Sequence, residues 1–330
     1  MKFADIRGQQ DIKAHLQNAI ARQKVSHAYI ITGEKDSGKM MLAEAFAATL
    51  MCEAHGPDAC GECHSCKQAW NHNHPDIRYV THEKPNTISV EDIRQQINND
   101  IVIKPYASDY KIYIVDEAEK MNKAAQNALL KTIEEPPSYG ILLLLTTNAA
   151  GFLPTIQSRC VTLELKPVQG DIIKKELMEQ QKIPDYQAEV CVAFAQGNLG
   201  KAIKLASSEE FNEMKSHMTS LMRRIGTMDL YGVSQEVKEL ETYKSQIQDY
   251  FDLMNIWFRD VLLYKATGKE ENITFQDEKM IIKRQAAQCS YEGLNQMIDA
   301  VKVAGRRIAS NGNYNLAVEL LLLSIKENMV

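Results

Sequence analysis

The 330-residue sequence lacks a long apolar run and any excess of basic charge. No stretch reaches the ~18 apolar residues that a membrane-spanning helix needs. The net charge is −5, and Lys and Arg form no dense stripe. These absences exclude a membrane span and argue against a free-standing, strongly basic nucleic-acid binder, although contact with DNA within a larger assembly stays open.

A secretion signal, internal repeats and low-complexity segments are also missing. The first ten residues, MKFADIRGQQ, do not have the apolar core of a signal peptide. The seven cysteines are therefore expected in a reducing cytoplasm, where clustered cysteines bind metal more often than they form disulfides. With 45% apolar and 25% charged residues, the chain has the composition of a globular protein with two or three domains.

The most informative stretch is SHAYIITGEKDSGKMMLAEAFAATL, residues 26–50. An apolar run at 28–32 predicts a strand, and Gly33 to Lys39 form a loop before a helix that begins at Met40. This is the arrangement of a phosphate-binding P-loop, with Gly33, Gly38 and Lys39 in the expected places. Backbone N–H groups of such a loop hold phosphates, and the lysine contacts the β/γ oxygens.

One residue departs from this pattern. A P-loop lysine is normally followed by Ser or Thr, whose hydroxyl binds Mg²⁺, whereas this chain has Met40. A thioether is a poor ligand for a hard cation that prefers oxygen. The sequence therefore predicts a phosphate cradle without complete machinery for hydrolysis, and weak or absent ATP binding.

Strand and helix patterns alternate up to about residue 166. Apolar strands are predicted at 76–80, 111–115, 141–146 and 161–165, with helices at 9–24, 40–50, 89–100, 121–133 and 153–157. Short loops between such elements indicate a parallel, doubly wound α/β sheet. From Asp171 onward no strand is predicted, and the helical stripe that includes Tyr250, Phe251 and Trp257 is typical of a core.

Polar residues follow two of the strands. Asp116 and Glu117 end the strand KIYIV, where a P-loop protein places the residue that supports Mg²⁺ and the one that polarises water. Asn148 follows the next strand, where it could sense a γ-phosphate. Taken alone, an asparagine there is equally typical of a turn.

Cys52, Cys60, Cys63 and Cys66 form the pattern C-x₇-C-x₂-C-x₂-C. Four thiolates at this spacing favour one tetrahedral, structural Zn²⁺. An iron–sulfur cluster is the rival interpretation, although its fourth cysteine usually lies downstream. Three histidines, His64, His72 and His74, are alternative ligands but are more typical of surface residues.

Arg159 lies in the tripeptide Ser-Arg-Cys before the last strand. A lone arginine at this place is most often solvated or ion-paired. At the edge of a nucleotide-binding sheet it could instead contact the phosphates of a neighbouring subunit.

Together and in this order, these motifs resemble the clamp-loader branch of the AAA+ ATPases. The resemblance covers the whole chain, through the P-loop, the cysteine insert, IVDEAEKMNKAAQNALLKTIEEPP, TTN, SRC and the helical C-terminal half. It implies an AAA+ domain at 1–166 with a zinc module at about 52–66, a small helical lid at 167–208 and a helical collar at 209–330. It also implies that Arg159 is an arginine finger donated in trans and that Asn148 is sensor 1.

The resemblance further implies a subunit of a DNA-directed DNA polymerase holoenzyme. The expected partners are gamma/tau-type ATPase and delta subunits in a hetero-pentameric ring, with a sliding clamp and primed DNA bound through the complex. Met40, and Gly200 where the ATPase members carry a sensor 2 arginine, indicate a stator that does not hydrolyse ATP itself. The alternatives are an active gamma/tau-type ATPase with a degenerate P-loop and a zinc-dependent DNA-binding module.

Overall fold

The computed structural model describes residues 1–329, which form two compact units. Unit 1 comprises Met1–Ile172 together with Asn198–Gly200. Unit 2 comprises Ile173–Gly197 and the chain from Lys201 onward. The predicted division of the helical part into a lid and a collar stays a prediction.

Unit 1 is built on five parallel strands. They are β1 (Ala28–Thr32), β2 (Ile77–Val80), β3 (Lys111–Val115), β4 (Gly140–Thr146) and β5 (Val161–Glu164), in the order β2-β3-β4-β1-β5. All four pairings are parallel, and Ala28 lies opposite Leu142 in the register of the central pair. The predicted parallel α/β sheet is confirmed, and it brings the ends of β1, β3 and β4 to one edge.

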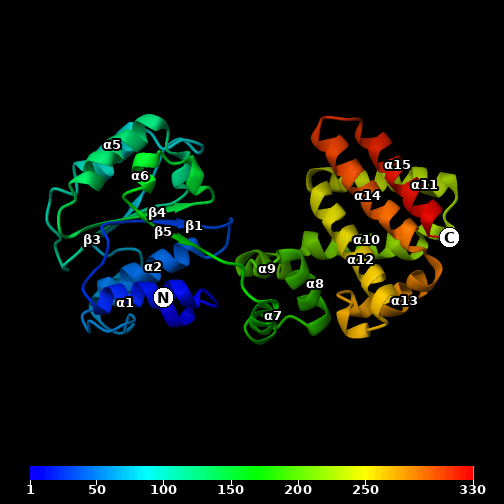
Figure 1. Cartoon of the computed structure of the whole chain (residues 1–330), viewed down its shortest axis with the longest axis horizontal. Helices are drawn as coiled ribbons and strands as arrows, with labels where there is room; N and C mark the ends of the chain where they lie inside the picture. Colours follow the sequence, from blue (N-terminus) through cyan, green and yellow to red (C-terminus); the bar gives the residue numbers. More distant parts are fainter. Residues whose placement is uncertain (330) are drawn as a thin grey trace. The chain divides into compact units, whose positions relative to one another are not determined.

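Helices cover both faces of this sheet (Figure 1). One face packs against α1 (Gln10–Ala21) and α2 (Lys39–Leu50), with Ile31 and Leu143 among the buried side chains. The other face, which includes Ile30 and Leu144, packs against α4 (Val90–Ile93), α5 (Lys123–Glu134) and α6 (Pro154–Gln157). Alternate residues of β1 and β4 therefore enter opposite cores, which makes both strands continuously apolar.

The helix predicted at 89–100 differs from its expected form. Ser89 caps α4 and exchanges hydrogen bonds with Asp92, as the capping-box pattern predicts. The α-helix ends after Ile93, and a π-helical turn continues from Arg94 to Asn98. The Asn99 N–H donates to the Arg94 carbonyl, five residues back, at 2.9 Å. The predicted single helix is thus an α-helix followed by a wider turn.

The chain after β5 is helical throughout its described part, up to residue 329, as predicted. Its α-helices are α7 (Gly170–Glu179), α8 (Asp185–Ala195), α9 (Leu199–Ala206), α10 (Glu209–Arg224), α11 (Leu230–Leu240), α12 (Ile247–Thr267), α13 (Lys279–Gln288), α14 (Tyr291–Ala309) and α15 (Tyr314–Asn328). Trp257 of α12 is fully buried and donates from Nε1 to Gln285 Oε1 at 2.8 Å. The aromatic stripe is therefore part of the core. Among the described helices, none combines the length and the apolar character that a membrane-spanning segment requires.

Candidate functional site

The P-loop joins β1 to α2 at the edge where the strands end. Gly38 caps α2 with φ +93°, a left-handed conformation that glycine adopts without strain. A Cβ atom at Gly38 would meet no atom within 4 Å, so the loop faces open space. The Ser37 hydroxyl is buried without a hydrogen-bond partner among the described residues. An open glycine turn with an unpaired donor fits a phosphate group.

A cleft of about 400 Å³ lies beside this loop. One wall is formed by the P-loop and the start of α2, and the other by Asp116, Glu117, Glu119 and Thr147. Thr147 donates from Oγ1 to Glu119 Oε1 at 2.7 Å. The sequence analysis did not single out Glu119 and Thr147, although both follow strands that end at this edge.

Lys39 is directed back onto its own loop. Its ammonium donates to the carbonyl oxygens of Gly33, at 2.8 Å, and Glu34, at 2.6 Å. Burial lowers the pKa of Lys39, while Asp116 and Glu119 oppose that shift. A phosphate would have to replace the two carbonyls as the partner of this lysine.

The cation-binding part of the cleft is incomplete. Met40 lines the cleft and also packs on the apolar core between α2 and the sheet, so it offers no oxygen to Mg²⁺. Asp116 accepts a hydrogen bond from the Glu117 N–H at 2.9 Å, and the Glu117 carboxylate is ion-paired with Lys120. The residues present therefore fit a phosphate better than they fit a magnesium–nucleotide complex.

Asn148 acts as the N-cap of the short 3₁₀ turn Ala149–Gly151. Its side-chain oxygen accepts a hydrogen bond from the Ala150 N–H at 3.1 Å. The residue that lines the cleft at this strand end is Thr147. The turn-forming interpretation therefore accounts for the geometry of Asn148, and its sensor role stays a prediction.

Asn198 and Gly200, which belong to unit 1, contact the P-loop. Asn198 donates from Nδ2 to the Lys35 carbonyl at 2.8 Å and to Glu34 Oε2 at 3.3 Å. A Cβ at Gly200 would lie 2.2 Å from the Asp36 carbonyl oxygen, a backbone atom that cannot yield easily. An arginine at position 200 is therefore incompatible with this arrangement of the loop.

The four predicted cysteine ligands come together in one cluster. The Sγ atoms of Cys52, Cys60, Cys63 and Cys66 all lie within 4.8 Å of one another. Cys52 follows the end of α2, while Cys63 caps α3 (His64–Trp70) and accepts from the Cys66 N–H at 3.3 Å. The Cys60 and Cys66 sulfurs are 3.9 Å apart, close to the ~3.8 Å between sulfurs on a tetrahedral zinc with Zn–S bonds of about 2.3 Å.

Backbone donors surround Cys60 in particular. The N–H groups of Glu62 and Cys63 donate to its sulfur, each at 3.4 Å, and they lower its pKa to about 6. Burial instead raises the pKa of Cys66. A cluster that stabilises one thiolate strongly and buries another thiol fits a soft divalent cation, which deprotonates its thiol ligands.

The three histidines lie outside this four-sulfur cluster. His64 and His72 are exposed, as expected of surface residues. His74 is only 3% exposed, so the prediction of a surface position was wrong. It begins the turn into β2, and its Nδ1 accepts from the Asp76 N–H at 3.2 Å. One ring nitrogen is thus paired with the local backbone, a contact that the sequence does not reveal, and Nε2 is buried without a hydrogen-bond partner among the described residues.

Arg159 follows α6 and precedes β5. Its side chain is 41% exposed and lies 3.2 Å from Glu134 Oε1, a carboxylate that is itself 47% exposed. It also donates to the Thr155 carbonyl at 3.0 Å. Ion pairs this exposed contribute at most about 1 kcal/mol, so the guanidinium is held only lightly in its place.

Two sequence models of one family match most of the chain. The model described as "DNA polymerase III, delta subunit" matches residues 8–169, and the model of its C-terminal part matches residues 210–327. The Bacillus subtilis DNA polymerase III subunit delta' is 29% identical over 94% of both chains. The Pseudomonas aeruginosa subunit delta' is 28% identical over 92% of both.

Subunits of another type are also similar. The Bacillus subtilis DNA polymerase III subunit tau is 30% identical over 98% of this chain, which spans 61% of tau. A solved Thermotoga maritima structure, a DNA polymerase III gamma subunit-related protein, aligns with 96% of this chain and 99% of its own, at 18% identity and a TM-score of 0.44. The similarity to the delta' chains extends over nearly their full length, whereas tau is much longer.

Proposed function

Since the chain belongs to the DNA polymerase III delta-subunit family, we propose that it is a delta'-type clamp-loader subunit that does not hydrolyse ATP itself. It joins gamma/tau-type ATPase and delta subunits in a hetero-pentameric ring that loads a sliding clamp onto primed DNA. The observation that carries the proposal is the incomplete cleft, in which Met40 stands where the Mg²⁺ ligand belongs and Gly200 lies against the Asp36 carbonyl.

In this role the P-loop region is a structural part of unit 1. Lys39 is satisfied by the carbonyls of its own loop, and Asn198 hydrogen-bonds to Lys35. Phosphoryl transfer depends on a metal ion that neutralises developing charge, and the chain lacks one of its oxygen ligands. Nucleotide binding is accordingly weak or absent.

The cysteine cluster holds one structural Zn²⁺. Cys52, Cys60, Cys63 and Cys66 supply four thiolates, which leave no coordination position open for catalysis. The ion cross-links the end of α2 to the start of α3. The N-terminus rests on the same module, since Lys2 Nζ donates to the Cys60 carbonyl at 2.7 Å.

Arg159 is the residue that acts on another subunit. A guanidinium is permanently charged and forked, so it can contact two phosphate oxygens of an adjacent ATPase site. Its exposure and its weak pairing with Glu134 leave it available for that contact. Arginines supplied in trans accelerate GTPases by about 10³–10⁵, which sets an upper range for one site of a ring.

The test compares rings assembled with wild-type, Arg159→Ala, Arg159→Lys and Glu134→Gln chains. Both Arg159 variants should assemble normally but lower the DNA- and clamp-stimulated ATPase rate and clamp loading. Glu134→Gln removes the ion pair and keeps the arginine, so it should retain full activity. Equal rates for all four rings would end the arginine-finger role, and a loss shared by Glu134→Gln would assign the effect to the ion pair.

The isolated chain provides a second check. Purified wild-type protein should not turn over ATP, and Met40→Thr alone should restore little, because Gly200 still faces the Asp36 carbonyl. Steady ATP hydrolysis by the wild-type chain that disappears in Lys39→Ala would instead favour an active gamma/tau-type ATPase.

A further inference from the structure

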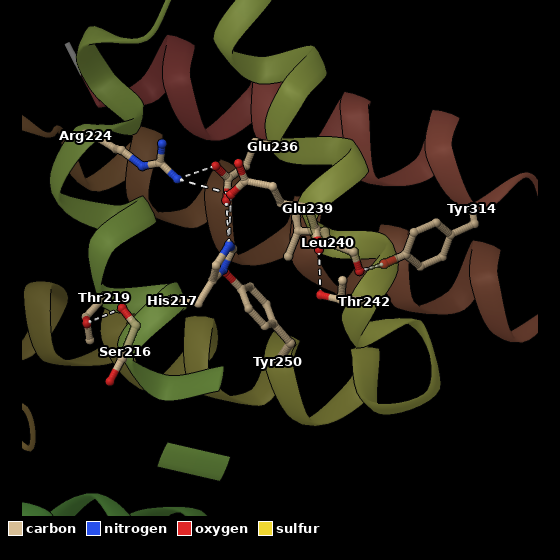
Figure 2. A network of polar contacts seen from close by, with 10 residues as sticks. All are labelled: Ser216, His217, Thr219, Arg224, Glu236, Glu239, Leu240, Thr242, Tyr250 and Tyr314. Atoms are coloured by element: carbon tan, nitrogen blue, oxygen red, sulfur yellow. Dashed lines mark hydrogen bonds and ion pairs between the residues drawn. The ribbon is translucent and has the colours of Figure 1, made fainter. Parts of the chain in front are cut away.

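Unit 2 contains a second cluster of metal-ligating side chains. His217 comes from α10, and Glu236 and Glu239 come from α11 (Figure 2). One ligand atom from each residue lies within 4.8 Å of the other two. The two glutamates are three residues apart and therefore share one face of their helix. Nothing in the P-loop or the cysteine cluster involves these residues.

The distances suit a small divalent cation. His217 Nε2 lies 3.4 Å from Glu236 Oε1 and 3.4 Å from Glu239 Oε2. Tetrahedral ligands bound at about 2.0–2.1 Å are ~3.4 Å from one another. An ion of this size could therefore be bound by all three residues with little movement of the side chains.

Glu236 has a carboxylate oxygen that lacks a hydrogen bond. Its side chain is 1% exposed, and Oε1, the oxygen that faces His217, has no hydrogen-bond partner among the described residues. The other oxygen, Oε2, is paired with Arg224 at 2.5 Å. Burying a carboxylate oxygen without a hydrogen-bond partner costs free energy, and a bound cation would offset that cost.

The charges around the cluster and the orientation of the imidazole also favour a bound cation. Arg224 is the cation paired with both carboxylates, and a single guanidinium does not balance Glu236 and Glu239 when both are ionised. Tyr250 OH lies 2.9 Å from His217 Nδ1. When it accepts the Nδ1 hydrogen, the Nε2 lone pair is free to face the carboxylates, which is how metal-bound histidines are usually held.

We propose that His217, Glu236 and Glu239 form a binding site for a first-row divalent cation such as Zn²⁺, separate from the cysteine cluster. An imidazole with two carboxylates suits this class of ion, and a water molecule completes four-coordination. The site joins α10 to α11 within unit 2. It does not depend on the proposed role in clamp loading.

The test measures zinc bound to the full-length chain after equilibrium dialysis against buffered free Zn²⁺. Wild-type protein should bind about two equivalents per chain, one at each cluster. His217→Ala and Glu239→Gln should retain only the cysteine-bound equivalent, or bind the second at least about tenfold more weakly. Glu241→Gln removes the same charge at an exposed neighbour and should behave as wild type.

Folding and ligand type need separate readouts. Glu239 is 57% exposed, so its glutamine variant is expected to fold, and circular dichroism checks this for each chain. Co²⁺ added to protein that holds a single zinc equivalent, at the cysteine cluster, should give the weak visible bands of a nitrogen and oxygen site, without the strong near-ultraviolet bands of thiolate ligands. Saturation of wild type at the cysteine-bound equivalent, or a second equivalent retained by folded His217→Ala and Glu239→Gln, would overturn the proposal.

Discussion

The cysteine cluster of unit 1 and the His217 cluster of unit 2 satisfy their ligand atoms in opposite ways. Around Cys60, backbone N–H groups from the same short segment donate to the sulfur, and no basic side chain is paired with a cluster thiol in the described structure. Around Glu236, a basic side chain already occupies one oxygen, since Arg224 lies 2.5 Å away. The cysteine cluster is stabilised mainly by backbone dipoles, with no basic side chain paired to a thiol, whereas the His217 cluster contains the guanidinium of Arg224.

This difference predicts different roles for a metal ion. Four thiolates brought together repel one another, so the 52–66 module needs a cation in order to hold its shape. In unit 2, Arg224 provides part of that neutralisation through the protein itself. A metal in unit 2 is therefore expected to add to a structure that is already folded, whereas the zinc proposed for unit 1 is expected to be a condition of local folding.

The largest expected effect is that of breaking the cysteine cluster. Cys66→Ser should abolish binding of the cysteine-held zinc and reduce the stability of unit 1 by upward of about 3 kcal/mol, since structural zinc sites bind with about 10–16 kcal/mol. Metal analysis and thermal unfolding measure both changes. His64→Ala is the control, because its side chain is exposed and lies outside the four-sulfur cluster. Full zinc content in Cys66→Ser would contradict the four-thiolate site.

An intermediate effect is expected when the internal counter-ion of unit 2 is removed. Arg224→Met leaves the buried Glu236 carboxylate without its cation and should cost about 1–3 kcal/mol, less than a fully buried pair because Arg224 is 45% exposed. The same change should strengthen zinc binding at His217, since the competing charge is gone. Denaturant unfolding and zinc titration report the two effects.

Lys238→Met serves as the matched control for Arg224→Met. It removes one positive charge from an exposed position of α11. Its effects on the free energy of unfolding and on zinc affinity should be no larger than those of removing any exposed surface charge. If Arg224→Met weakened zinc binding, the guanidinium would be a support for the site, and the contrast between the two clusters would fail.

The smallest effect should come from the residue that orients His217. Tyr250→Phe removes the hydroxyl at 2.9 Å from Nδ1 and should cost about 1 kcal/mol of stability. Zinc affinity at the cluster should fall about tenfold, because the imidazole loses its fixed orientation. Tyr243→Phe is the control, since the Tyr243 ring packs 5.2 Å from His217 without a hydrogen bond to it. Equal zinc affinities for the two variants would show that Tyr250 serves packing alone.

Contiguous patterns predicted much of the fold and of the candidate site. The P-loop turn, the cysteine cluster and each individual strand depend on residues close together in the chain, so spacing and periodicity reveal them. The same reasoning failed for His74, because its burial comes from a turn that packs the ring inside. It also missed the π-helical turn after Ile93, since a wide turn has no distinct apolar period.

What the sequence determined by itself is therefore local: a glycine turn before a helix, four cysteines in one short segment, and Met40 in place of an oxygen ligand. Only the tertiary structure decided that Glu119 and Thr147 line the cleft. It also decided that Gly200 lies against the Asp36 carbonyl. The cluster of His217, Glu236 and Glu239 is a third contact of this kind. These contacts join segments up to about 160 residues apart, and packing of apolar faces fixes their geometry. Sequence spacing cannot predict these contacts, because the length of the intervening chain does not fix where its two ends lie.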